Sequence, residues 1–190
     1  QNSLAVLAAI SAVGADVAAA AKTLSELMPI AGRGTRLTIE INDGNFTIID
    51  ESYNANPASM RAAIETLAVM QPGPCAKRIA VLSDMRELGE RSRDYHVELA
   101  KILSTHGIDK VYACGKYMAA MFDALPADLK GGFSNSTAEL GQTISKKVRA
   151  GDVVTVKGSL ASGMKTVVNQ LIALQIDAGA KSQSISNGNR

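Results

Sequence analysis

Residues 50–70 read DESYNANPASMRAAIETLAVM, a polar segment followed directly by a helical pattern. The apolar pair Ile48-Ile49 before it is typical of the end of a buried strand. Pro57 is expected to be the first helical residue, because proline loses no hydrogen bond at that position, and Asn56 is suited to cap the helix. The stretch therefore predicts a strand, a polar turn and a helix that begins at Pro57.

The segments that follow alternate between helical and strand patterns. Helices are expected at 57–70, 91–106, 116–124, 137–149 and 161–174, strands at 78–82, 109–114 and 152–157, and a short apolar piece near Phe133. Ahead of them, two apolar runs at 37–41 and 46–49 flank Asn42-Asp43-Gly44-Asn45, whose Asp-Gly pair tolerates positive φ and is typical of a hairpin turn. The pattern predicts an α/β fold with a mostly parallel, Rossmann-like sheet that starts with an antiparallel hairpin.

The N-terminal part of the chain reads as a separate helical pair. Helices are expected at 2–13 and 16–28, with Gly14 ending the first and Asp16 capping the second. Pro29–Gly34 then reads as a linker. We expect domain limits at 1–33 and 34–176, followed by a disordered tail at 177–190, whose apolar content is too low to offset the entropy of ordering.

Three polar segments follow the ends of predicted strands. They are Asp50–Asn56, Ser83–Glu90 and Lys157–Ser162. Ligands of open α/β sheets bind beyond the carboxyl ends of the strands, so these segments are expected to converge on one functional rim.

The same segments carry a resemblance to one family. Ser52-Tyr53-Asn54-Ala55-Asn56 resembles the linker motif of the Mur ligases, in the branch that adds D-alanyl-D-alanine. Ser83-Asp84-Met85-Arg86-Glu87-Leu88-Gly89 resembles a second motif of that family, with Ser83 in place of the usual Gly. Val156-Lys157-Gly158-Ser159 resembles a third, although Leu160 stands where Arg is often found.

The resemblance implies an ATP-dependent, amide-forming ligase of peptidoglycan precursor synthesis. Its carboxylate substrate, UDP-N-acetylmuramoyl tripeptide, would be activated by ATP and Mg²⁺ as an acyl phosphate, which the amine of D-alanyl-D-alanine then attacks. No P-loop is present in the chain; in the nearest approach to one, Met164 displaces Lys165 by one helical position. Residues 1–9 resemble the end of a helix of the family's central ATPase domain. The chain is therefore expected to be the C-terminal portion of such a ligase, inactive alone and without a complete catalytic set or metal site.

The resemblance also implies roles for individual residues. Those expected near ATP are Asn2, Arg33, Asp50, Asn54 and Asn56. For the dipeptide, Lys157 with the amides of Gly158 and Ser159 suits the carboxylate, and Asp84 or Glu87 suits the ammonium group. Simpler structural roles stay open: a turn and a helix cap for Asp50 and Asn56, a loop cap for Asp84, a solvated strand end for Lys157 and a solvated linker residue for Arg33.

Composition and patterning argue against nucleic-acid binding and membrane insertion. The net charge is +2, and with three Phe and four Tyr the chain gives little support to nucleic-acid binding. The apolar run from Leu4 to Ala21 is interrupted at Gly14-Ala15-Asp16, which argues against membrane insertion. Cys75 and Cys114 have neither metal nor disulfide spacing, which favours the reducing cytoplasm.

Two other functions are weighed against the ligase. One is a folylpolyglutamate or cyanophycin ligase domain, which the Asn-Ala-Asn-Pro and Asp-Met-Arg-Glu-Leu-Gly strings disfavour. The other is a non-enzymatic module of doubly wound α/β type that binds a small ligand.

Overall fold

The computed structural model describes residues 2–26 and 30–176, with only the backbone of Asn2. The chain divides into two compact units, with the division between Ile30 and Ala31. The predicted tail and the linker residues 27–29 lie outside the described residues, so the expectations for them stay predictions.

The first unit is a pair of helices, α1 (Asn2–Ala12) and α2 (Val17–Glu26). Gly14 has a φ of 74°, a left-handed conformation that suits glycine at a helix end. The carboxylate of Asp16 accepts hydrogen bonds from the amides of Ala18 and Ala19, at 2.8 and 3.0 Å. The predicted helix stop and helix cap are therefore confirmed.

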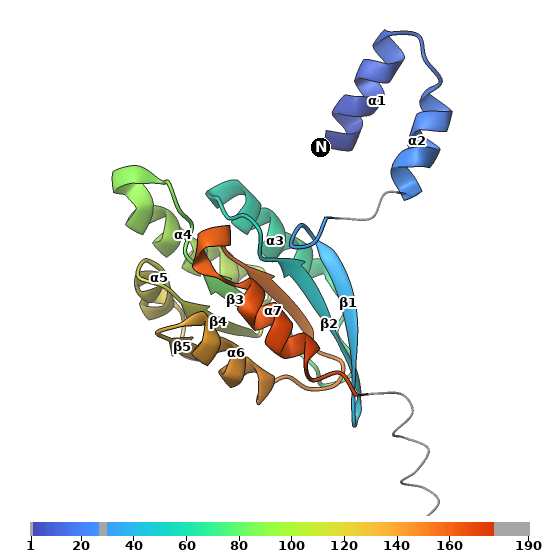
Figure 1. The fold of residues 1–190 in the computed structure, drawn as a ribbon. Coiled ribbons are helices and arrows are strands. Elements are labelled where there is room, and N and C mark those ends of the chain that lie inside the picture. The colour runs from blue at the N-terminus through green and yellow to red at the C-terminus, as the bar shows by residue number, and fades with distance from the viewer. Residues whose placement is uncertain (1, 27–29, 177–190) are drawn as a thin grey trace, which may run out of the picture. The chain divides into compact units, whose positions relative to one another are not determined.

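The second unit is built around a six-stranded sheet (Figure 1). Its strands are β1 (Thr35–Ile41), β2 (Gly44–Glu51), β3 (Arg78–Ser83), β4 (Lys110–Cys114), β5 (Lys130–Ser134) and β6 (Val153–Lys157). Their order across the sheet is β1-β2-β6-β3-β4-β5, in which only the β1-β2 pair is antiparallel. The predicted α/β class, with a hairpin leading into a parallel sheet, is confirmed.

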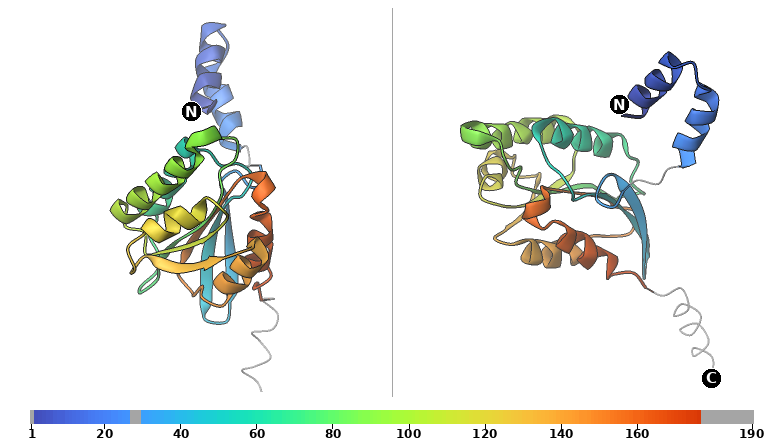
Figure 2. Two further views of the ribbon diagram at one scale, coloured as in Figure 1. Left: turned by 90° about the vertical axis from the view of Figure 1, so that its left-hand side faces the viewer. Right: turned by 45° about the horizontal axis from the view of Figure 1, so that its top comes forward.

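Helices cover both faces of this sheet, as Figure 2 shows. On one face α3 (Pro57–Val69), α4 (Ser92–Thr105) and α5 (Met118–Ala124) bury a core that includes Met60, Leu82 and Leu103. On the other face α6 (Thr137–Ser145) and α7 (Lys165–Ile172) bury a second core around Phe46 and Val154. Two short 3₁₀ turns precede α4 and α7, at Gly89–Arg91 and Leu160–Ser162.

Helix α7 begins at Lys165 rather than 161, and two further local details differ from the sequence expectation. The hairpin turn has only two residues, because Ile41 pairs with Gly44, and Gly44 alone takes the positive φ, at 136°. Helix α6 ends at Ser145 rather than 149. The carboxylate of Asp152 accepts the amide of Arg149 at 2.8 Å, which turns the chain toward β6 before the helix can continue.

The parallel arrangement brings the carboxyl ends of β2, β6, β3, β4 and β5 to one edge of the sheet. The segments that follow these strands carry the polar residues singled out in the sequence.

Candidate functional site

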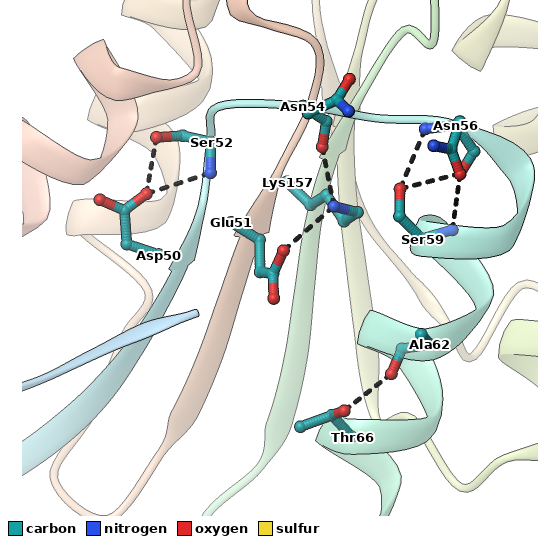
Figure 3. Close-up of polar contacts among 9 residues, drawn as sticks. All are labelled: Asp50, Glu51, Ser52, Asn54, Asn56, Ser59, Ala62, Thr66 and Lys157. Atoms are coloured by element: carbon teal, nitrogen blue, oxygen red, sulfur yellow. Dashed lines mark hydrogen bonds and ion pairs between the residues drawn. The ribbon is translucent and has the colours of Figure 1, made fainter. Parts of the chain in front are cut away.

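Asp50 lies at the end of β2, and its side chain is bound by other residues of the protein. Its side chain accepts hydrogen bonds from the amide and hydroxyl of Ser52, at 3.1 and 2.6 Å, and pairs with Lys165 Nζ at 2.9 Å. The two bonds to Ser52 are drawn in Figure 3. Burial alone would raise the pKa of Asp50, but the bonds from Ser52 and Lys165 together hold that pKa below its ordinary value. The turn predicted for Asp50 is present, and an ion pair with α7 fixes it further.

Lys157, at the end of β6, is buried with 1% of its surface exposed. Its ammonium group donates to Glu51 Oε2 at 3.2 Å and to the carbonyl oxygen of Asn54 at 2.8 Å (Figure 3). Burial lowers the pKa of Lys157, and the neighbouring Glu51 opposes that shift. The alternative of a solvated strand end is therefore wrong, since Lys157 joins the end of β6 to the segment after β2.

Asn56 caps α3. Its side-chain oxygen accepts the amide of Ser59 at 2.8 Å, and the Ser59 hydroxyl accepts the amide of Asn56 at 3.0 Å, a reciprocal capping box (Figure 3). Pro57 occupies the first turn, as predicted. The Asn54 side chain is exposed and has no hydrogen bond to the residues that the structure describes.

Arg33 is exposed and lies over the ring of Tyr53, with its guanidinium carbon 4.4 Å from the ring centroid. The backbone holds the two together, since the Tyr53 amide donates to the Gly32 carbonyl at 3.1 Å and the Gly34 amide to the Asp50 carbonyl at 2.8 Å. Residues 32–34, the end of the segment that the sequence indicates as a linker, thus lie fixed against the end of β2.

The segment after β3 presents side chains of both charges. Asp84 is buried, and its carboxylate accepts the amides of Tyr117 and Met118 at 3.1 and 3.0 Å. Arg86 and Glu87 are exposed, and Glu87 has a φ of 63°, which a non-glycine residue seldom adopts.

Two cavities adjoin at this edge of the sheet. The larger, of about 620 Å³, is lined by the segments after β3, β4, β5 and β6, and includes Arg86, Lys116 and Thr137. The second, of about 400 Å³, is lined by Asn54, Glu87, Ser159 and their neighbours. Arg86 and Ala161 line both cavities. The hydroxyl of Ser159 is buried and has no hydrogen-bond partner among the described residues.

The structure thus brings the predicted residues of the second unit to one edge of the sheet. Some of their side chains line a cavity, and others are already bonded within the protein. Glu87, Ser159 and Asn54 line a cavity, whereas Asp50, Asn56 and Lys157 are engaged by internal partners. The Asn2 side chain lies outside the described residues. Sequence reasoning missed Arg86 and Lys116. Arg86 lies in the segment after β3, and Lys116 follows the end of β4 after one residue, Gly115, so both stand at the edge where ligands of such sheets bind.

The comparisons with known proteins agree with this geometry. Residues 32–160 match the model of the Mur ligase, glutamate ligase domain. The chain belongs to the Mur ligase family. The matched span begins at Gly32, which contacts Tyr53, and ends at Leu160, so it includes most of the residues that line the two cavities.

Relatives of this Mur ligase chain carry one shared name. UDP-N-acetylmuramoyl-tripeptide–D-alanyl-D-alanine ligases of Escherichia coli, Bacillus subtilis and Rickettsia prowazekii are 34%, 33% and 30% identical to it, over 90%, 90% and 88% of its length. It spans 36%, 37% and 36% of the length of those relatives.

Solved structures give the same likeness. MurF from Acinetobacter baumannii superposes with a TM-score of 0.74 at 27% identity, over 90% of this chain and 37% of that one. MurF from Thermotoga maritima, solved in complex with ADP, superposes with a TM-score of 0.68 at 26% identity, over 88% of this chain and 36% of that one.

None of the described helices of this Mur ligase chain combines the length and apolar character needed to cross a bilayer. Within residues 2–26 and 30–176, no group of three or more His, Cys, Asp and Glu side chains is arranged to hold a metal ion.

Proposed function

We propose that this chain is the dipeptide-binding portion of an ATP-dependent ligase that joins D-alanyl-D-alanine to UDP-N-acetylmuramoyl tripeptide. The names of its relatives support this substrate pair. The observation that most directly supports dipeptide binding is the pair of adjoining cavities at the carboxyl edge of the sheet. Neighbouring loops place groups of opposite charge in these cavities.

A dipeptide zwitterion needs a cation at one end and a hydrogen-bond acceptor at the other. Arg86 and Lys116 line the larger cavity and suit the carboxylate of D-alanyl-D-alanine. Glu87 and the Ser159 hydroxyl, which has no hydrogen-bond partner among the residues that the structure describes, line the smaller cavity and suit the ammonium group. This orientation differs from the sequence expectation, in which Lys157 received the carboxylate, because Lys157 is buried and already donates to Glu51 and Asn54.

In this orientation of the dipeptide, its nucleophilic amine lies on the side of Arg33 and Asn54, the residues expected near ATP. Asn54 lines the same cavity as Ser159, and Arg33 lies on Tyr53, which also lines it. The exposed guanidinium of Arg33 and the exposed side-chain amide of Asn54 fit phosphate oxygens of ATP. Asp50 and Asn56 would then support this surface from within, through the bonds that already hold them.

Bound ATP would supply the phosphoryl group that activates the carboxylate of the tripeptide, with Mg²⁺ carried on its phosphates. The residues of this chain would hold the amine of the dipeptide in line with that carboxylate. Because ATP and a UDP-linked substrate are both cytoplasmic, a cytoplasmic location is part of the proposal.

Dipeptide binding is testable on the 190-residue chain. Titration with D-alanyl-D-alanine, followed by amide NMR, is expected to shift the signals of Ser159, Lys116 and their neighbours. L-alanyl-L-alanine is the matched control, since it is the mirror image of D-alanyl-D-alanine and carries the same charges. Equal shifts with both dipeptides, or none with either, would contradict the proposed binding site.

The ligase reaction is tested in a full-length ligase that contains this chain. A relative's ligase in which this chain replaces the corresponding portion serves the same purpose. We expect release of ADP and phosphate only when ATP, the UDP-linked tripeptide and the dipeptide are all present, and a product heavier by the dipeptide less water. ATP hydrolysis without formation of that product would contradict the proposal.

A further inference from the structure

Asp84 makes contacts that tie together three segments of the site. Its side chain is held between the segments that follow β3 and β4, with 6% of the residue exposed. One oxygen, Oδ1, accepts both the Tyr117 amide at 3.1 Å and the Met118 amide at 3.0 Å. Within the part of the chain that the structure describes, the N-cap residue Tyr117 makes no side-chain cap to helix α5, so the Asp84 carboxylate satisfies amides that the first turn would otherwise leave without a partner.

The backbone on either side of Asp84 is fixed as well. Its carbonyl oxygen accepts the Ser159 amide at 3.3 Å, which joins the segment after β3 to the one after β6. The Met85 amide donates to His96 Nε2 at 2.9 Å, while His96 Nδ1 lies 2.6 Å from the Ser92 carbonyl. Because the Met85 amide is a donor, His96 Nε2 is its acceptor, and Nδ1 is the ring nitrogen that donates to the Ser92 carbonyl.

Gly115 leaves the space that the carboxylate occupies. A Cβ atom at Gly115 would lie 2.4 Å from Asp84 Oδ1, and the φ of 122° there is unfavourable for any side chain. Gly115 is thus matched to Asp84, and the residue that follows it, Lys116, lines the larger cavity.

We propose that Asp84 is a positioning residue of the dipeptide site and acts through its acceptor oxygen, not through its negative charge on the substrate ammonium group. It holds Lys116 in the larger cavity through the amides of the next two residues, and it holds Ser159 through its carbonyl. This proposal rests on the proposed function for its kinetic consequence, although its structural consequence is independent of any activity.

The acceptor role predicts a difference between two substitutions. In Asp84→Asn, the side-chain oxygen remains and accepts the same two amides, while the charge is lost. In Asp84→Ala, both the charge and the acceptor are lost. A charge-based role would make the two variants equally defective, whereas an acceptor role separates them.

The first measurement is amide hydrogen exchange on the 190-residue chain. Exchange at Tyr117 and Met118 is expected to quicken by about tenfold in Asp84→Ala and to stay near wild type in Asp84→Asn, because only the first loses the acceptor. Gly115→Ala tests the same contact from the other side and should resemble Asp84→Ala. Asp94→Ala and Asp94→Asn, at an exposed carboxylate on α4, serve as matched controls.

The second measurement is steady-state kinetics in a full-length ligase. Asp84→Ala is expected to raise the KM for D-alanyl-D-alanine by about tenfold or more, with a smaller change in the KM for ATP, and Asp84→Asn to keep it within about threefold of wild type. Loss of dipeptide binding in Asp84→Asn, with the two amides still protected, would overturn the proposal and assign the charge to the substrate. Unchanged amide exchange in Asp84→Ala would also overturn it. An inactive wild-type ligase would instead count against the proposed function and leave the exchange result standing.

Discussion

The guanidinium carbon of Arg33 lies 4.4 Å from the centroid of the Tyr53 ring. A cation over an aromatic face is attracted by the ring, and an exposed pair of this kind contributes about 0.5–1 kcal/mol. Two backbone hydrogen bonds join residues 32–34 to residues 50–53. The Tyr53 amide donates to the Gly32 carbonyl, and the Gly34 amide donates to the Asp50 carbonyl. Arg33 is thus presented on a platform that belongs to the second unit.

This platform predicts a difference between two substitutions of Tyr53 in a full-length ligase. Tyr53→Phe keeps the ring and should leave the KM for ATP near wild type. Tyr53→Leu removes the ring and should raise that KM by about twofold to fivefold, as expected for losing up to about 1 kcal/mol. In an Arg33→Ala background, Tyr53→Leu should have no further effect. An equal effect of Tyr53→Leu with and without Arg33 would show that the ring acts independently of the arginine.

The local features of the fold could be predicted because they depend on neighbours in sequence. The cap at Asn56, the helix start at Pro57 and the hairpin before β2 follow from residues within a few positions of one another. The parallel sheet followed from the alternation of helical and strand patterns, and the convergence of its loops followed from the parallel sheet.

The contacts within the site could not be predicted in the same way. Lys157 meets Glu51 across 106 positions of the chain, and Lys165 meets Asp50 across 115. From the sequence, Lys157 could be placed at the end of a strand and Lys165 one helical position away from where a phosphate loop would need it. Their acidic partners, Glu51 and Asp50, could not be predicted. Lys116 was missed for a related reason, since its place in a cavity depends on the positions of four neighbouring loops.

Gly158 is expected to resist substitution because of packing. A Cβ atom there would lie 2.5 Å from Ser162 Oγ, 2.7 Å from Met164 Cγ and 3.1 Å from Ser83 Cβ. Gly158→Ala should therefore lower the free energy of unfolding by about 1–3 kcal/mol, as overpacking does in buried positions. Urea unfolding of the 190-residue chain measures this. Gly132→Ala is the control, because Gly132, like Gly158, does not have a positive φ, and the atom nearest to its added Cβ, Tyr112 Cδ1, lies 3.4 Å away. A loss in Gly158→Ala no greater than the error of the measurement would contradict the packing argument.

The end of the described chain covers part of the sheet edge. The Ile176 amide donates to the Glu40 carbonyl at 3.0 Å, and the Glu40 amide donates to Gln175 Oε1 at 2.9 Å. A chain that stops after Ile176 should keep the melting temperature of the 190-residue chain. One that stops after Leu174 should melt about 2–4 °C lower, because it loses two hydrogen bonds in a partly exposed setting worth about 1 kcal/mol together. Equal melting of the two shortened chains would show that this contact contributes no stability.

Asp50 predicts a specific loss of stability in acid. Its pKa is lower in the folded protein than in the unfolded chain, so the carboxylate stabilises the fold at neutral pH, and this contribution disappears as the pH falls from about 4 through the folded-state value. Asp50→Asn should lower the free energy of unfolding at pH 7 by about 1–2 kcal/mol, a modest figure because the Lys165 side chain is 49% exposed and solvent weakens the ion pair. The difference between the variant and wild type should shrink toward pH 3, because the wild-type carboxylate also loses its charge. Urea unfolding between pH 3 and 7 measures both effects, with Asp43→Asn in the exposed hairpin turn as the control. A difference that stays constant across this range would mean that the side-chain shape of Asp50, and not its charge, stabilises the turn.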